Sequence, residues 1–378
     1  MYHSVIGKPS LRVGLLIGLL LGLSLLLLTA CGGQNSAKGG GDDDEENESA
    51  KGGSTRNGQI VFRRYLDPDQ TKGAIFTMNP DGSHLSQITH PPKGWRDDVP
   101  AWSPDGTKVA FQRGRIDESM SRIMVLNVDT GDVREVTHCG PNQGPLNRTG
   151  ACDSDFDPAF SPDGRSIAFQ RVLVQNKPCC WLQGIWIIGL DGSDPHQVTN
   201  VDPKLPAEFE DFGPAFSPNG KMLVFDRSRV ADERHAVFVQ PIDSSGSPQA
   251  ARQITPWKLN CQDHPEFSPD GNLVLFRCLP KGEEGPANLY WVHPDGTGLH
   301  QITHAPAHTQ YLGSSFSPSF SEEEGWITVG RTAGYGKEGN ADVFRVRLED
   351  GGVVRKVNLT KSAIWDSGPG WGTHPPVG

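Results

Sequence analysis

The sequence predicts an all-β protein, a six-bladed β-propeller whose C-terminal strand closes the first blade. The main observation is a short motif, an aromatic residue followed by Ser-Pro-Asp-Gly or a partial form of it, that returns six times. Its intervals are 58, 56, 51, 49 and 55 residues, and a nearly fixed period of this size indicates a repeat architecture. Each repeat is long enough for the four short strands of a propeller blade. The motif aromatics are Trp102, Phe160, Phe216, Phe267, Phe316 and Trp371.

Two further landmarks give the same number of blades. A turn rich in Asp, Gly and Ser returns six times, and so does a short strand that ends in Thr after Ile, Val or Leu. Because these landmarks are independent of the first motif, their agreement fixes the predicted blade number at six. The turns lie at 79–83, 128–132, 190–193, 243–247, 293–297 and 349–352. The threonines are Thr89, Thr137, Thr199, Thr255, Thr303 and Thr360.

The first element along the chain is a targeting segment. Lys8 and Arg12 precede an apolar run at 13–28, which is shorter than the roughly 20 residues of a membrane span. The run ends in Leu-Thr-Ala-Cys31, which resembles the lipobox of bacterial lipoproteins. The resemblance implies a signal peptide at 1–30 and lipidation of Cys31. An ordinary secretory signal and an uncleaved anchor are the alternatives.

Residues 31–57 predict a flexible tether. After Cys31 the segment consists mainly of Gly, Ser, Asn and Lys, carries an acidic run at 42–48, and has no large apolar residue. Such a composition cannot bury enough apolar surface to fold, so we expect a linker between the lipid anchor and the propeller. The propeller then occupies residues 58–378.

One blade serves as the template for the others. Strands are predicted at 100–102, 109–111, 123–126 and 133–137, with turns at 103–106 and 128–132. In the first turn Pro suits the first central position and Gly the left-handed position that follows. The folded part of the chain begins with a second-type strand at 59–62 and ends with a first-type strand at 366–372. The C-terminal strand therefore closes the first blade and covers two sheet edges.

The repeat Asp-x-x-Pro-x-(Trp/Phe)-Ser-Pro-Asp-Gly, with its closing Ile-Thr or Val-Thr strand, resembles the propeller repeat of TolB-like proteins. The same repeat occurs in the propellers of prolyl-oligopeptidase-type enzymes. The resemblance covers residues 58–372 and implies a propeller fold. The chain lacks the Gly-x-Ser-x-Gly elbow of the peptidases, so we expect no peptidase activity. The predicted propeller follows directly on the predicted tether, so we expect no counterpart of the α/β domain that precedes the propeller in TolB.

Carboxylates and arginines recur at matching positions of the repeat. With Ser103 paired to Thr107 across the first turn, counting outward places an aspartate of the first strand opposite an arginine of the second. This predicts a ring of pairs near one mouth of the central channel. The pairs either tie two strands together or present spare carboxylates to a cation or to a basic group of a partner. The residues are Asp97, Arg113, Asp155, Arg171, Asp211, Arg227, Asp263, Arg277 and Asp366.

The cysteines predict disulfides, because an even number beyond the lipidated one in an exported chain is typical of bridges. Cys139 and Cys152 bracket an insertion, and Cys179 and Cys180 either bridge each other or pair elsewhere. Cys261 and Cys278 flank one hairpin, but the register above places them one residue out of opposition, which conflicts with a bridge unless the strand ends splay. The disulfide candidates are Cys139, Cys152, Cys179, Cys180, Cys261 and Cys278.

No metal or cofactor is predicted. The cysteines lack the spacing of a zinc site, and His264 is the one histidine with a plausible position at the channel axis, too few for a transition-metal site. A structural divalent cation in the channel is the alternative. The net charge of −10 and the pI of about 5.6 argue against nucleic acid as a partner.

The sequence therefore predicts a monomeric, non-catalytic lipoprotein, anchored to the bacterial cell membrane on its extracytoplasmic or periplasmic side. Its propeller would serve as a scaffold that binds one or more envelope proteins. The alternative is a propeller enzyme or ligand-binding protein that acts on envelope glycans or peptides, with a cation in the channel. Carboxylates that are already paired with arginine favour the scaffold, and unpaired convergent carboxylates favour the alternative.

Overall fold

A computed structural model describes most of the predicted propeller. The described residues are 58–138, 154–173, 182–199, 208–242, 250–280, 285–306, 309–321, 323–332 and 340–377. The predicted signal peptide, the tether and Cys31 lie outside these residues. The described residues belong to one compact unit. No helix in the described segments is long and apolar enough to span a bilayer.

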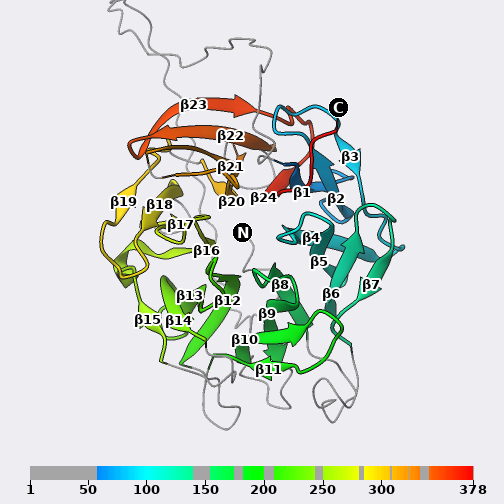
Figure 1. Cartoon of the computed structure of the whole chain (residues 1–378), viewed down its shortest axis with the longest axis horizontal. Coiled ribbons are helices and arrows are strands. Elements are labelled where there is room, and N and C mark those ends of the chain that lie inside the picture. Colours follow the sequence, from blue (N-terminus) through cyan, green and yellow to red (C-terminus); the bar gives the residue numbers. More distant parts are fainter. Residues whose placement is uncertain are drawn as a thin grey trace, which may run out of the picture. The chain divides into compact units, whose positions relative to one another are not determined.

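Six four-stranded antiparallel sheets form a ring, so the predicted six-bladed propeller is confirmed (Figure 1). In each blade the first strand lies at the channel and the fourth at the rim. Blade 1 contains β24 (Asp366–Trp371), β1 (Ile60–Tyr65), β2 (Gly73–Met78) and β3 (Ser86–Gln87). Blade 2 contains β4 (Trp95–Trp102), β5 (Lys108–Arg115), β6 (Ser121–Asn127) and β7 (Val133–Glu135). Blade 3 contains β8 (Ser154–Phe160), β9 (Ser166–Leu173), β10 (Leu182–Gly189) and β11 (His196–Gln197).

The other three blades follow the same order. Blade 4 contains β12 (Phe209–Phe216), β13 (Met222–Arg229), β14 (Arg234–Pro241) and β15 (Arg252–Gln253). Blade 5 contains β16 (Cys261–Phe267), β17 (Val274–Cys278), β18 (Asn288–Val292) and β19 (His300–Gln301), and a short 3-10 helix η1 (Trp257–Leu259) precedes it. Blade 6 contains β20 (Tyr311–Phe316), β21 (Glu324–Thr332), β22 (Ala341–Glu349) and β23 (Gly352–Asn358).

The C-terminal strand closes the ring as predicted. β24 pairs with β1, which places both chain ends of the described propeller in blade 1 (Figure 1). Beyond β24 the chain stays attached, because the Gly58 N–H donates to the Gly372 carbonyl at 3.1 Å and the Gln59 N–H to the His374 carbonyl at 2.7 Å. The Trp371 indole N–H also donates to the Gly58 carbonyl at 2.9 Å.

The hydrophobic core lies between successive blades rather than inside any one of them. One cluster joins Ala110, Ile123 and Val125 of blade 2 to Phe160 and Phe169 of blade 3, all of which are buried. Each blade is a single sheet, so its two apolar faces can be buried only against its neighbours. The stability of the ring therefore depends on contacts between blades.

The first hairpin departs from the predicted register. The Ser103 N–H donates to the Lys108 carbonyl at 2.8 Å, so Ser103 lies across from Lys108 and not from Thr107. A bulge further along β4 shifts the pairing by one residue. Asp97 therefore lies opposite Arg113 after all, for a reason that the turn alone does not supply.

The bulge recurs on every inner strand and contains a residue with positive φ. In five strands it is one residue, whereas in β16 both Asp263 and His264 have positive φ, at 78° and 52°. This extra residue shifts the register of β16 by two positions instead of one. The single-residue positions are Val99, Asp157, Gly213, Gly313 and Gly368.

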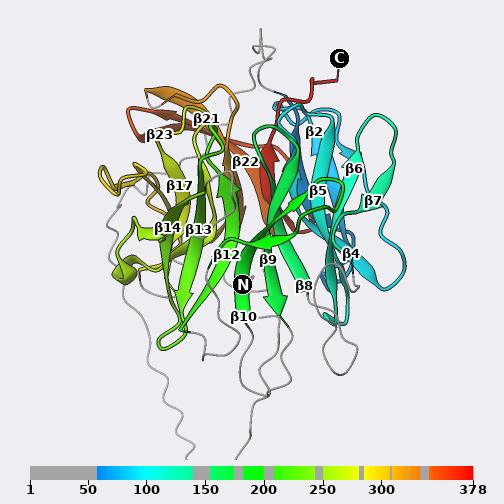
Figure 2. The same ribbon diagram turned by 60° about the horizontal axis from the view of Figure 1, so that its bottom comes forward.

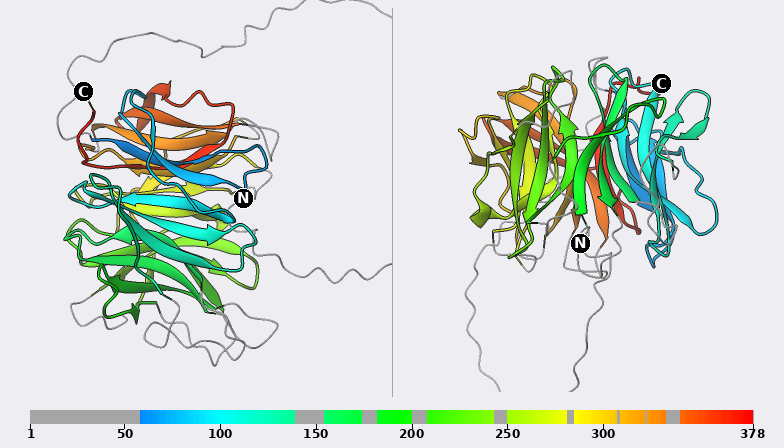
Figure 3. Two further views of the ribbon diagram at one scale, coloured as in Figure 1. Left: turned by 90° about the vertical axis from the view of Figure 1, so that its right-hand side faces the viewer. Right: turned by 90° about the horizontal axis from the view of Figure 1, so that it is seen from below.

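The connections divide between two faces of the ring, and the strands run between these faces (Figures 2 and 3). The short-turn face carries the Ser-Pro-Asp-Gly turns and the turns that join the third and fourth strands. The long-loop face carries the described connections between second and third strands, which are 66–72, 116–120 and 230–233, and the described residues that enter the inner strands. The first residues of the inner strands lie at this second face.

Candidate functional site

The structure brings the predicted aspartates and arginines together in four blades. In blade 2 the Arg113 guanidinium donates to both carboxylate oxygens of Asp97, at 2.6 and 2.8 Å. The same bidentate geometry joins an arginine of the second strand to an aspartate of the inner strand in blades 1, 3 and 4. The other pairs are Arg64–Asp366 (2.7 and 2.7 Å), Arg171–Asp155 (2.6 and 3.0 Å) and Arg227–Asp211 (2.6 and 2.9 Å).

These carboxylates are buried and do not open to a channel mouth. The side chains of Asp97 and Asp366 are 0 % exposed, and those of Asp155 and Asp211 are 2 % exposed. Burial raises the pKa of Asp97, while the hydrogen bonds and the charge of Arg113 oppose that rise. Desolvation of both ions offsets much of their attraction. The pairs therefore hold two neighbouring strands together, since a partner in solvent cannot reach these carboxylates.

A threonine of the preceding blade contacts the aspartate in three of these pairs. We call the boundary between successive blades a seam, and the Thr, Asp and Arg that meet there a seam lock. At the first seam the Thr89 side chain contacts the Asp97 carboxylate, and its Oγ1 accepts the Ile75 N–H at 2.9 Å. Each lock thus connects the third strand of one blade to the first two strands of the next. The corresponding contacts at other seams are Thr199–Asp211 and Thr360–Asp366.

In blade 5 the expected pair is arranged differently. Gln262, not Asp263, lies opposite Arg277, because the longer bulge moves the aspartate one position along β16. The Arg277 Nε lies 3.4 Å from the Asp263 carboxylate, and its Nη1 donates to the Tyr311 carbonyl of blade 6 at 2.8 Å. The Gly313 N–H donates to Asp263 at 2.9 Å. Asp263 therefore joins blade 5 to blade 6.

One further ion pair crosses a seam and was not predicted. The Arg63 Nη1 donates to both oxygens of Asp98, at 2.8 and 2.7 Å, from blade 1 to blade 2. Both side chains are nearly inaccessible. The sequence signal for this pair is that blade 1 has two consecutive arginines, Arg63-Arg64, and blade 2 has two consecutive aspartates, Asp97-Asp98. Counting along one hairpin cannot show which arginine pairs with an aspartate of another blade.

Another polar cluster on the inner strands surrounds His264. Its Nε2 lies 3.1 Å from Oδ1 of Asp157, and its Nδ1 lies 3.3 Å from Oδ1 of Asp263. Burial disfavours the imidazolium, but the two carboxylates outweigh burial and raise the pKa of His264 well above its usual 6.5. Burial likewise opposes ionisation of Asp263, but Arg277 and His264 hold the pKa of that carboxyl far below its usual range.

Glu266 is a second titratable group on β16 that the sequence analysis missed. Burial raises its pKa to about 8, against the opposing hydrogen bonds from Ser315 and the Phe316 backbone. The Ser315 hydroxyl donates to Glu266 at 3.2 Å across the seam. The corresponding residues in blades 2, 3 and 4 are alanines, so a carboxyl at this repeat position was the available signal.

The cysteine prediction is resolved at one pair. Cys261 and Cys278 lie directly opposite each other and form a disulfide. The predicted register, which opposed this bridge, is wrong because the bulge of β16 contains two residues and restores the alignment. Cys139, Cys152, Cys179 and Cys180 lie outside the described residues.

No group of three or more His, Cys, Asp or Glu side chains that could hold a metal ion occurs among the described residues. Asp157, Asp263 and His264 form the nearest approach to such a group, and their contacts are ion pairs with one another and with Arg277. A cation in the channel stays a prediction.

Comparison with solved structures shows a shared fold. TolB from Acinetobacter baumannii aligns with a TM-score of 0.57 at 18 % identity, over 84 % of this chain and 67 % of that one. A putative TolB from Agrobacterium tumefaciens aligns with a TM-score of 0.53 at 19 % identity, over 85 % of this chain and 94 % of that one. Hydrazine synthase from Kuenenia stuttgartiensis aligns with a TM-score of 0.58 at 12 % identity, over 85 % of this chain and 48 % of that one. No protein-family profile and no curated protein matches the sequence. The predicted TolB-like propeller fold is confirmed, and at these identities the likeness concerns the fold alone.

Proposed function

We propose that this chain is a non-catalytic scaffold of the bacterial cell envelope, exported and held at the membrane through a lipidated Cys31, whose propeller binds an envelope protein. The observation that carries the proposal is the state of the inner-strand carboxylates. Four of them are buried in bidentate pairs with arginine. Their charge is used to tie the inner strand to the second strand of the same blade, so binding falls to the outer surface of a rigid ring.

The long-loop face is the surface best suited to a protein partner. Leu66, Phe209 and Val230 lie at this face and are 44 %, 37 % and 45 % exposed. Connecting loops on a rigid scaffold commonly carry binding residues, and exposed apolar side chains rimmed by polar groups are typical of protein interfaces. The same face also carries the exposed ion pairs Arg115–Asp117 and Arg229–Asp232.

The likeness to TolB structures supports this reading in outline. It places the chain in a propeller fold that is also found in proteins named TolB. Function does not follow from fold alone, so the proposal depends on the surface and on the paired carboxylates.

The test is capture of a partner from detergent-solubilised envelope by the immobilised protein, identified by mass spectrometry at low and high salt. We expect one stoichiometric protein whose capture weakens at high salt, because screening reduces the contribution of the surrounding charges. Leu66→Glu and Val230→Glu should abolish capture. Leu85→Glu and Leu299→Glu are matched controls, since these leucines are 44 % and 39 % exposed but lie next to turns of the short-turn face.

Equal capture by both sets of variants would remove the long-loop face from the proposal. Absence of any captured protein at either salt would count against the scaffold. The alternative, an enzyme or ligand-binding protein for envelope glycans or peptides, would then be tested by titration with divalent cations, with Asp157→Asn as the control for the group around His264.

A further inference from the structure

One seam differs from the others in both sequence and shape. At the seam between blades 5 and 6 the position that holds Asp97 in blade 2 is Tyr311, since each lies five residues before its motif aromatic. The matching arginine is kept as Arg331, which lies opposite Tyr311 as Arg113 lies opposite Asp97. The seam threonine, Thr303, is also kept, and its Oγ1 accepts the Leu289 N–H at 2.9 Å. This lock therefore has every part except its carboxylate.

Arg331 has no acidic partner among the residues that the structure describes. Its guanidinium lies 5.5 Å from the ring centroid of Phe344, and its polar contact is the Tyr311 hydroxyl, which also contacts Thr303. In four other blades the equivalent arginine is neutralised by two hydrogen bonds to an aspartate. A guanidinium presents a planar fork that matches one carboxylate. Arg331 keeps this fork without the group that it fits.

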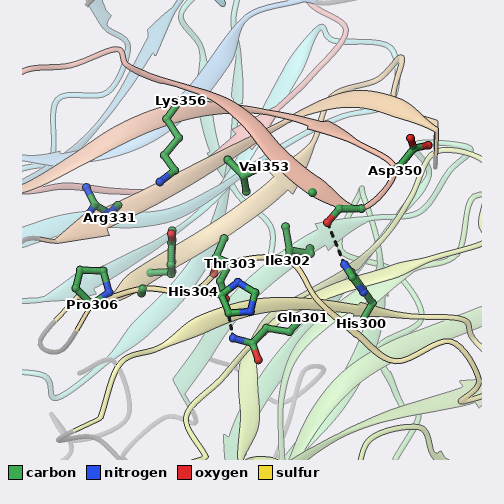
Figure 4. A pocket seen from close by; sticks show the side chains of 14 residues that line it. His300, Gln301, Ile302, Thr303, His304, Pro306, Arg331, Asp350, Val353 and Lys356 are labelled. Carbon is green, nitrogen blue, oxygen red and sulfur yellow. Dashed lines mark hydrogen bonds between the residues drawn. The ribbon is translucent and has the colours of Figure 1, made fainter. Parts of the chain in front are cut away.

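A pocket opens at this seam. Its volume is about 410 Å³, and it is lined by β19 and the segment that follows it, by Tyr311 of β20 and Arg331 of β21, and by the turn at 350–351 with β23 as far as Lys356. That size falls within the range of small-molecule sites. Figure 4 shows the Lys356 and Arg331 side chains at one end of the pocket and Asp350 at the far end. The cationic end is therefore separate from the acidic residue.

Other residues of the pocket lining contribute amide and imidazole groups in addition to the charged side chains. The side chain of Gln301 donates to the Thr303 carbonyl at 2.8 Å, and His300 contacts the Gly351 carbonyl at 3.0 Å. His304 also lines the pocket and is exposed. Two cations at one end, with neutral hydrogen-bonding groups and the single carboxylate of Asp350 elsewhere, suit a small molecule with one acidic group and several polar ones.

We propose that this pocket, at the seam between blades 5 and 6, binds a small carboxylate-bearing molecule, whose carboxylate takes the place of the aspartate missing from the lock. The carboxylate accepts two hydrogen bonds from Arg331, as Asp97 does from Arg113, and Lys356 supplies a second charge. An acidic sugar and the free C-terminus of a short peptide share this chemistry. The pocket shares no lining residue with Leu66, Phe209 and Val230, the exposed apolar residues proposed for protein binding.

The experiment is isothermal titration of the protein with two carboxylate probes, glucuronate and N-acetyl-alanyl-alanine. Glucose and the C-terminal amide of the same dipeptide are the neutral controls, and inorganic phosphate is the control for a general anion site. We expect at least one carboxylate probe to bind, and its neutral counterpart not to bind. Which probe binds distinguishes a sugar ligand from a peptide ligand.

Three variants assign the binding to named side chains. Arg331→Gln should weaken binding by at least about 10-fold, the effect expected for loss of a bidentate charged pair. Lys356→Gln should weaken it less, and because Lys356 is exposed on β23 this variant keeps the fold. Arg355→Gln is the matched control, since Arg355 is the neighbouring exposed cation and does not line the pocket; its affinity should equal that of the wild type.

The proposal is overturned if neither carboxylate probe binds, if a neutral control binds as tightly as its acid, or if phosphate binds as tightly as both acids. It is also overturned if Lys356→Gln and Arg355→Gln behave alike and Arg331→Gln, folded by its circular dichroism, binds as the wild type does.

Discussion

The imidazole Nε2 of His264 in blade 5 lies 3.1 Å from Oδ1 of Asp157 in blade 3, although blade 4 stands between them. The reach is possible because the intervening bulge residue is Gly213, where an added Cβ would lie 3.1 Å from the His264 Cα. Bulges in three consecutive blades therefore make this contact possible. Asp157 and His264 contribute the side chains, and Gly213 leaves the space between them because it has no side chain. The inner strands are coupled across the channel as well as along the ring.

This contact predicts a pH-dependent contribution to stability. Folding raises the pKa of His264, so the contribution is fully present below the unfolded value near 6.5 and is lost as the pH rises through the higher folded value. His264→Gln should remove that part of the profile. Because the His264 side chain is about a third exposed, screening limits the effect to about 1 kcal/mol. Urea unfolding at several pH values measures it, and identical profiles for variant and wild type would contradict the assignment.

Glu266 predicts a second pH effect with a separate variant. Its folded pKa of about 8 exceeds the usual 4.5, so the neutral form is favoured by folding and stability declines as the pH rises from about 5 through 8. Glu266→Gln keeps a neutral hydrogen-bonding group and should be more stable than the wild type above pH 8, by about 2 kcal/mol given partial exposure. Equal stability at pH 5 is the internal control. A variant that loses stability at both pH values would show that Glu266 is ionised in the fold.

The seam locks predict a large cost for removing one partner of a buried pair. Arg171→Met leaves the Asp155 carboxylate buried without its cation, because both side chains are 2 % exposed. We expect a loss of about 3–5 kcal/mol in the free energy of unfolding. Arg115→Met is the matched control on a neighbouring blade, since its pair with Asp117 is exposed; its unfolding midpoint should stay close to that of the wild type. Similar losses in the two variants would argue against the lock.

The disulfide between Cys261 and Cys278 should stabilise blade 5. The two cysteines are 17 residues apart in sequence, and a crosslink that closes a loop of this size contributes about 3 kcal/mol. The Cys261→Ala/Cys278→Ala variant should therefore unfold at lower denaturant concentration than the oxidised wild type. Reduced wild type should approach the variant, and unchanged unfolding under reductant would show that the bridge does not contribute.

Loss of the closing strand should prevent formation of the ring. A chain that ends at residue 365 lacks β24, leaves β1 as an open sheet edge and removes Asp366 from the lock with Arg64. We expect an expanded or aggregating species by size-exclusion chromatography. A chain that ends at residue 375 is the control, because among the described residues it loses only the hydrogen bonds between Val377 and Asn79 beyond the strand; it should elute as the wild type does. Equal elution of both truncated chains would contradict strand closure.

Much of the fold could be predicted because the relevant chemistry is local. The turn residues Pro104 and Gly106 set the backbone of one hairpin, and the roughly 50-residue period repeats that information along the chain. The partners of Asp97, Asp155 and Asp211 followed from counting along a hairpin, although the count at the turn was wrong by one residue and the bulge compensated for it. The same count failed at Cys261, where the bulge is one residue longer.

By itself the sequence determined the blade number, the order of strands and the closing role of β24, because turn chemistry and hydrophobic period act over a few residues. Only the tertiary structure decided which groups meet at the seams. The contacts of His264 with Asp157, of Glu266 with Ser315 and of Arg331 with a pocket join residues from different blades. Their physical basis is the ring itself, in which the length of one bulge or the absence of one side chain on a neighbouring strand determines what a residue can reach.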